Sequence, residues 1–243
     1  MIDMQGIFSH SDYNDTVKCF KDSDCNWNLF QSLHKNVSNN KCPICEAKLD
    51  DTSYPSCFST IDHFRPKAEN MYPYLKCEPD NYILMCSLCN SRYKKSKFPL
   101  ISGIKRAKTI KEIVKEQPLL FNPAKEKPLD FFELAFRQTQ VGNILELKRK
   151  NDVPKDSDKY QRCEAMIQLF GLGYIHKDIH PNEETKNLRL DILTAHYETF
   201  IQLAQDLQDG NKKSAALFLK DRKEELKKYG FYQFLMKKQF HVY

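Results

Sequence analysis

The sequence has no apolar run long enough to cross a bilayer, and its first ten residues lack the basic stretch and apolar core of a signal peptide. It contains no internal repeat and no low-complexity segment. Its seven glycines form no Gly-x-Gly-x-x-Gly motif and no other phosphate-cradling loop. These absences predict a cytoplasmic protein that makes no contact with membranes and does not bind nucleotides through a glycine-rich loop.

What is present is typical of a soluble protein with one large domain or two small ones: 243 residues, 29% charged and 41% hydrophobic. The nine cysteines are an odd number, so they cannot all pair, and a cytosolic setting disfavours a disulfide framework. Cysteine pairs with the spacing Cys-x-x-Cys in that setting indicate metal binding.

Two such pairs enclose an Asp-His dipeptide. Four thiolates can close a tetrahedral zinc site, and the ligands predicted here are Cys42, Cys45, Cys86 and Cys89. Forty residues separate the pairs, against roughly 15–20 in a simple zinc ribbon, so an insertion the size of a β-hairpin is expected. Cys57 and Cys77 lie inside this insertion, and we interpret them as small hydrophobic residues.

The remaining polar residues of this region are not needed for the zinc. Asp62 and Asn90 offer oxygen atoms suited to Mg²⁺ or Mn²⁺, and His63 offers a general base. Neighbouring side chains on a strand point to opposite faces, so a twist at the strand end is needed for Asp62 to hold a metal while His63 faces a water. Asn81 is expected to fix the loop that carries His63 through local hydrogen bonds.

Positive charge is concentrated after the second cysteine pair. Residues 92–115 hold nine basic residues against one acidic residue, Glu112. Such a stripe attracts phosphate backbones, although a solvated helix face has the same pattern. The periodicity predicts a basic helix from Ile101 to Glu116, ended by Pro118.

The rest of the chain divides by its periodicity. Two short helices are expected within 12–38. The alternating residues after Phe132 and the Gly142-Asn143 turn predict a β-hairpin, and helices follow from Asp156. The expected units are an N-terminal helical segment (1–39), a zinc-bound module (40–100), a basic helix with the hairpin (101–155) and a C-terminal helical region (156–243). The fold class is α+β and mainly helical.

The motifs Cys42-x-x-Cys45, Asp62-His63, Asn81 and Cys86-x-x-Cys89-Asn90 with Lys94 resemble the HNH endonuclease family. That resemblance implies a ββα-metal fold with His63 as general base, Asp62 and Asn90 as ligands of one catalytic Mg²⁺ or Mn²⁺, Asn81 as the loop-holding asparagine, and one structural zinc. Asn90 stands where the family often has a second histidine. The candidate phosphate-binding residues are Arg65, Lys67, Arg92, Lys94 and Lys95.

Further stretches, from Asp62-His63-Phe-Arg-Pro-Lys67 to Pro118-Leu-Leu-Phe-Asn-Pro123, resemble the PtuB-type HNH proteins. Proteins of that type belong to antiphage systems of the Septu kind and to some retrons. The resemblance implies an effector that cuts DNA, or RNA such as tRNA, and partners of three kinds: a PtuA-like ABC/SMC ATPase, a retron reverse transcriptase and its msDNA. Two alternatives remain open, a zinc module that binds nucleic acid without cutting it and a scaffold subunit.

Overall fold

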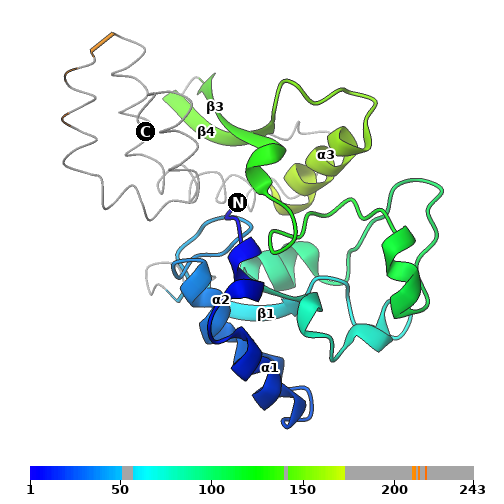
Figure 1. Ribbon diagram of the computed structural model, residues 1–243. Coiled ribbons are helices and arrows are strands. Elements are labelled where there is room, and N and C mark those ends of the chain that lie inside the picture. The colour runs from blue at the N-terminus through cyan, green and yellow to red at the C-terminus, as the bar shows by residue number, and fades with distance from the viewer. Residues whose placement is uncertain (51–56, 140–141, 173–209, 212, 214–216, 218–243) are drawn as a thin grey trace.

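A two-stranded antiparallel sheet lies at the centre of the N-terminal half of the computed structural model (Figure 1). Its strands are β1 (Ser59–His63) and β2 (Tyr82–Cys86), and the register pairs Ser59 with Cys86 and His63 with Tyr82. The structure describes residues 1–50, 57–139, 142–172, 210, 211, 213 and 217.

Short helices pack on one face of this sheet, beside β1 in Figure 1. They are α1 (Tyr13–Lys21), the 3₁₀ helix η2 (Trp27–Phe30) and α2 (Gln31–Val37), so the prediction of short helices within 12–38 is confirmed. Phe20, Phe30 and Tyr82 join them to β2 through rings whose centroids lie 5.3–5.6 Å apart. Such edge-on and tilted contacts between large buried rings add to the stability of this part of the core.

The opposite side of the sheet is covered by η5 (Leu88–Lys94), a π-helix that follows β2 almost directly. Its wide turn is closed by the Lys95 amide, which donates to the carbonyl of Asn90 at 2.7 Å. The order of strand, strand and helical segment thus places the two cysteine pairs and the polar residues around one small sheet. The remaining 3₁₀ helices of the described residues are η1 (Gln5–Ser9), η3 (Pro73–Leu75), η4 (Pro79–Asn81), η6 (Ile110–Lys115) and η7 (Pro128–Asp130).

The second half of the described chain contains the hairpin and one helix. β3 (Phe132–Thr139) and β4 (Gly142–Arg149) pair as an antiparallel hairpin, which confirms the predicted one. α3 (Asp158–Phe170) begins at Ser157, whose hydroxyl accepts from the Tyr160 amide, and ends at Gly171 with φ of +62°. Its buried side is made of Cys163, Met166, Ile167 and Phe170, as the periodicity predicted. The fold class is α+β.

Residues 101–116 do not form the predicted long basic helix. Only η6 is helical there, and the Ile101 amide donates to the carbonyl of Gln117 instead of starting a helix. Gly103 has φ of +83°, outside the helical region, and the buried carboxylate of Glu116 accepts from the Ala107 amide at 2.7 Å. These longer-range bonds outweigh the local helical pattern. Of the predicted C-terminal helical region (156–243), residues 173–209 lie outside the described residues.

The interpretation of Cys77 as a small hydrophobic residue was wrong. Cys77 forms a disulfide with Cys25, with Cα atoms 5.3 Å apart. The bond joins the segment before η2 to the loop between the two strands. Cys57, in contrast, forms no disulfide and is buried, as expected for a small hydrophobic residue.

Candidate metal centre and active site

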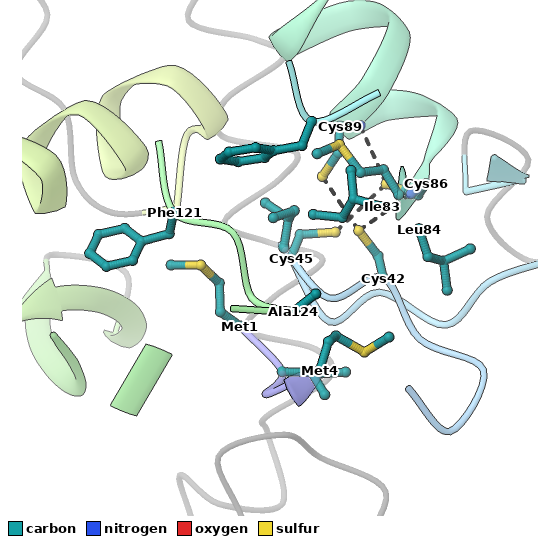
Figure 2. Close-up of a cluster of buried hydrophobic side chains, with 14 of the residues drawn as sticks. Met1, Met4, Cys42, Cys45, Ile83, Leu84, Cys86, Cys89, Phe121 and Ala124 are labelled. Atoms are coloured by element: carbon teal, nitrogen blue, oxygen red, sulfur yellow. Dashed lines mark hydrogen bonds between the residues drawn. The ribbon is translucent and has the colours of Figure 1, made fainter. Parts of the chain in front are cut away.

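The four predicted zinc ligands form one buried cluster, shown in Figure 2. Their sulfur atoms all lie within 4.8 Å of one another, with Cys42 and Cys89 3.6 Å apart and Cys45 and Cys86 3.7 Å apart. A tetrahedral zinc site with bonds of about 2.3 Å has sulfur atoms about 3.8 Å apart. The cluster therefore has the dimensions of a zinc site and could hold that ion.

Local backbone geometry points the sulfurs inward. Glu46 has φ of +62°, which turns the chain so that its amide donates to the carbonyl of Cys42 at 2.8 Å. The second pair lies across the junction of β2 and η5, where the Cys86 amide donates to the sulfur of Cys42 and the Cys89 amide to that of Cys86. Burial raises the pKa of the Cys42 thiol, so a bound cation is what would keep this cluster as thiolates.

Strand alternation separates the predicted catalytic residues. His63 faces the aromatic side chains between the sheet and the short helices. The centre of its ring lies 5.1 Å from that of Trp27 and 5.2 Å from that of Tyr82. Asp62 faces η5 instead, where it contacts Lys94. The Asp62 carboxylate and the His63 ring therefore leave β1 on opposite faces, at the same end of the strand.

His63 is oriented by a backbone carbonyl. Its Nε2 lies 2.9 Å from the carbonyl oxygen of Lys76, which also accepts from the Tyr82 hydroxyl at 2.8 Å. A carbonyl can only accept, so Nε2 carries the proton and Nδ1 keeps the lone pair. Burial lowers the pKa of His63, and the nearby cations of Lys67 and Lys94 lower it further against the opposing effect of the Lys76 bond. The ring is thus held neutral.

Two cross-links join β1 to η5. Lys94 donates to Asp62 Oδ2 at 2.7 Å, and Asn90 donates from Nδ2 to the Thr60 hydroxyl at 3.0 Å. The Thr60 hydroxyl donates its own proton to the carbonyl of Met85 at 2.9 Å, so it can only accept from the side-chain amide of Asn90. This bond fixes the orientation of Asn90 and leaves its Oδ1 as the acceptor. Asp62 and Asn90 come from adjacent elements on the same side of the sheet.

Asn81 is buried and binds the loop that follows His63. Its Oδ1 accepts from the Arg65 amide at 2.8 Å, and its Nδ2 donates to the carbonyl of Arg65 at 2.9 Å. Its own carbonyl accepts from the Phe64 amide at 2.7 Å. The loop after β1 is thereby fixed in place.

The candidate phosphate-binding residues occupy different environments. Lys67, Arg92 and Lys95 are exposed, and the ammonium of Lys67 lies 3.5 Å from the centre of the Trp27 ring. Arg65 donates to the buried Glu116 at 2.9 Å, while Lys94 is fully buried against Asp62 rather than at the surface. Other exposed members of the basic stripe are Lys97, Lys105, Lys108, Lys111 and Lys115.

A cavity of about 390 Å³ lies near this site, between the loop after β1 and α3. Arg65, Glu116 and Arg162 are among its lining residues, but Asp62, His63 and Asn90 are not. The candidate catalytic residues therefore lie outside this cavity.

Comparison with known proteins supports the resemblance seen in the motifs. The chain is 32% identical over 133 residues to the Septu protein PtuB of Bacillus mycoides (strain KBAB4). Half of this chain is thus similar to a PtuB protein. The match covers 50% of this chain but only 43% of that PtuB, so less than half of the relative is represented. No family model and no solved structure matches the chain.

Several residues of the site could not be found from the motifs. Thr60 looks like an ordinary strand residue, and its role depends on a helix thirty residues away. Glu116 binds Arg65, Tyr72 and the Ala107 amide, yet the sequence offers it only as the last residue of a basic helix. The carbonyl of Lys76 is a backbone group, so no residue type in the sequence could indicate its contact with His63. The Cys25–Cys77 disulfide was also missed, because Cys77 was interpreted as a small hydrophobic residue and Cys25 has no neighbouring motif.

Proposed function

We propose that the protein is a metal-dependent HNH-type nuclease that hydrolyses phosphodiester bonds. The observation that carries the proposal is His63, a neutral imidazole with Nε2 bound to the Lys76 carbonyl and Nδ1 left to accept a proton, at the strand end that also bears Asp62. A histidine that only packs in the core needs no Nδ1 lone pair at a strand end whose other face carries a carboxylate. A general base at neutral pH does.

In this proposal His63 Nδ1 takes the proton from the attacking water. The Asp62 carboxylate and the Asn90 Oδ1 are hard oxygen donors on neighbouring elements, which fits one Mg²⁺ or Mn²⁺. When bound, that ion would stabilise the charge that develops on the phosphate and the leaving oxygen. A phosphodiester lying across the end of β1 would reach both faces of the strand, which is what the separation of Asp62 and His63 requires.

The cysteine cluster supplies the rigid base in this proposal. A zinc ion bound by Cys42, Cys45, Cys86 and Cys89 would fix the start of η5 and hence the positions of Asn90 and Lys94. It would take no part in the reaction, because all four positions of a tetrahedral site are filled by sulfur.

Substrate binding would rely on the exposed basic residues. Lys67, Arg92 and Lys95 lie close in sequence to the proposed catalytic residues, and the stripe 92–115 extends this positive charge. Contacts to phosphate explain affinity but not sequence preference. Both DNA and RNA, including tRNA, fit this description.

Similarity to a Septu PtuB supports a role as the effector of an antiphage system. A PtuA-like ABC/SMC ATPase is the partner that such a role implies, and a retron reverse transcriptase with its msDNA is the corresponding partner in retron systems. A second candidate function is supported by the Lys94–Asp62 pair, which occupies the proposed metal ligand. Under that alternative the module binds nucleic acid, or serves as a scaffold, without cutting.

Cleavage by purified variants tests the proposal. His63→Ala should keep the fold and the zinc content but lose Mg²⁺-dependent cleavage of single-stranded DNA, duplex DNA and total RNA by about 10²–10⁴-fold, the usual contribution of a general base. His10→Ala, which removes a partly exposed imidazole bound to Asp12, is the matched control. Undiminished cutting by His63→Ala removes His63 from the mechanism, and no cutting by the wild type with its partner ATPase favours the binding module.

A further inference from the structure

Lys94 is an unusual residue because its ammonium is completely enclosed. Its side chain is 1% exposed and donates to Asp62 Oδ2 at 2.7 Å and to the His63 carbonyl at 2.8 Å. The carboxylate of Asp62 is 16% exposed, so solvent or an ion can reach it from one side. An enclosed ammonium is costly unless it is paired and hydrogen bonded, and both acceptors lie at the proposed metal site.

The neighbouring cross-link defines the rest of that site. Asn90 precedes Lys94 by four residues, and Thr60 precedes Asp62 by two, so the pairs Thr60–Asn90 and Asp62–Lys94 lie side by side between β1 and η5. The first pair uses the amide nitrogen of Asn90, so its oxygen remains an acceptor. In the second pair, the Lys94 ammonium neutralises the Asp62 carboxylate, which together with the Asn90 oxygen would bind a divalent ion.

We propose that Lys94 is an internal counter-cation that occupies the Asp62 carboxylate in the metal-free protein and sets the affinity of the site for divalent ions. This inference rests on the proposed function. A divalent ion bound by Asp62 must either displace the ammonium from Oδ2 or bind the other oxygen close to a positive charge. Both routes weaken binding, because like charges a few ångströms apart repel strongly where water is excluded.

The Asp62–Lys94 ion pair also stabilises the fold while no divalent ion is bound. Without the ammonium, the partly buried Asp62 loses its counter-charge, and the junction of β1 and η5 becomes less stable. An ion bound there restores the missing positive charge. A bound ion should therefore raise the stability of a variant with a neutral residue at position 94 more than it raises that of the wild type.

Mn²⁺ titration of the full-length, zinc-loaded protein without nucleic acid tests this role. Free Mn²⁺ is followed by electron paramagnetic resonance, and the Mn²⁺-induced rise in Tm is recorded in parallel. Lys94→Met should bind Mn²⁺ at least tenfold more tightly than the wild type and show the larger rise in Tm. Lys94→Gln, which keeps a hydrogen-bond donor, serves if the methionine variant fails to fold. Lys97→Met, at an exposed position, should behave as the wild type.

Asp62→Asn separates the possible failures. If the wild type binds Mn²⁺ and Asp62→Asn does not, the metal site is established. Mn²⁺ binding by both Lys94 variants that is then equal to or weaker than that of the wild type overturns the counter-cation role and leaves the nuclease proposal intact. Mn²⁺ binding that is absent from the wild type and from every variant overturns the counter-cation role together with the proposed metal site.

Discussion

Withdrawing the metal from the four-cysteine cluster should unfold the small sheet while leaving α3 folded. The cluster ties the turn at Cys42 and Cys45 to the end of β2 and the start of η5, segments more than forty residues apart in sequence. The segment 42–49 is also held by its own turns, by the Met1–Glu46 ion pair at 2.6 Å and by the bond from the Ile2 amide to the Pro43 carbonyl, but these contacts join it to the N-terminus and not to β2 or η5. Loss of the ion leaves four buried thiols that only weakly attract one another.

The size of the effect follows from typical zinc affinities. A structural zinc site contributes on the order of 10 kcal/mol at neutral pH, whereas an entire domain is stable by roughly 5–15 kcal/mol. A zinc ion bound there would therefore account for most of the stability of this region. Cys45→Ser, which removes one ligand, should abolish tight zinc binding. Cys163→Ser, a buried thiol of α3 outside the cluster, should leave zinc content unchanged.

Hydrogen exchange read by mass spectrometry measures this directly. After treatment with a strong chelator, amides of residues 42–49 and 82–94 should exchange orders of magnitude faster, while those of 163–170 change little. Zinc content should fall in the same samples from one ion per chain to none. Unchanged protection of β2 and η5 in metal-free protein would refute the argument that the ion holds this sheet together.

Two further predictions concern groups outside the metal centre. Burial lowers the pKa of His34 to about 4, whereas in the unfolded chain it is about 6.5. Protonation therefore favours the unfolded chain, so the free energy of unfolding is unaffected above about pH 6.5 and is lower by about 2 kcal/mol at pH 5. Urea unfolding across this pH range should show that loss, and His34→Leu should reduce it, whereas a slope unaffected by the substitution would contradict the assignment. Replacing both Cys25 and Cys77 by serine should lower stability by about 4 kcal/mol, the loop-closure value for a separation of 52 residues. Equal urea midpoints for the double variant and the oxidised wild type would count against the bond.

Local patterns in the sequence predicted those elements whose stability depends on nearby residues. The helix from Asp158 has its cap at Ser157, its stop at Gly171 and a continuous apolar stripe, all within fifteen residues. The alternation likewise predicted the β3–β4 hairpin, but not its turn, because Gly142 and Asn143 belong to β4 and pair with Thr139 and Gln138. The cysteine cluster was predictable for a different reason, since zinc ligands come in pairs with a fixed spacing whatever the fold between them.

Long-range contacts explain the predictions that were wrong. The stretch 101–116 has the composition of a helix, but Ile101 pairs with Gln117 and Glu116 reaches back to Arg65, Tyr72 and Ala107. A buried carboxylate that accepts several hydrogen bonds outweighs a few tenths of a kcal/mol of helix propensity per residue. The Cys25–Cys77 bond is similar, because partners 52 residues apart share no local pattern.

The strand period explains why the candidate site has two sides. Residues 60 and 62 must face η5 if residues 61 and 63 face the aromatic side chains, and the register with β2 permits no other arrangement. An Asp-His pair on a strand therefore cannot act as a single unit within the sheet. It places a carboxylate among cations on one face and a neutral imidazole among aromatic rings on the other. In the proposed mechanism both act on a phosphodiester that lies across the end of β1, where Asn81 fixes the chain that follows. This is why the loop-holding asparagine matters as much to the proposed chemistry as the dipeptide itself.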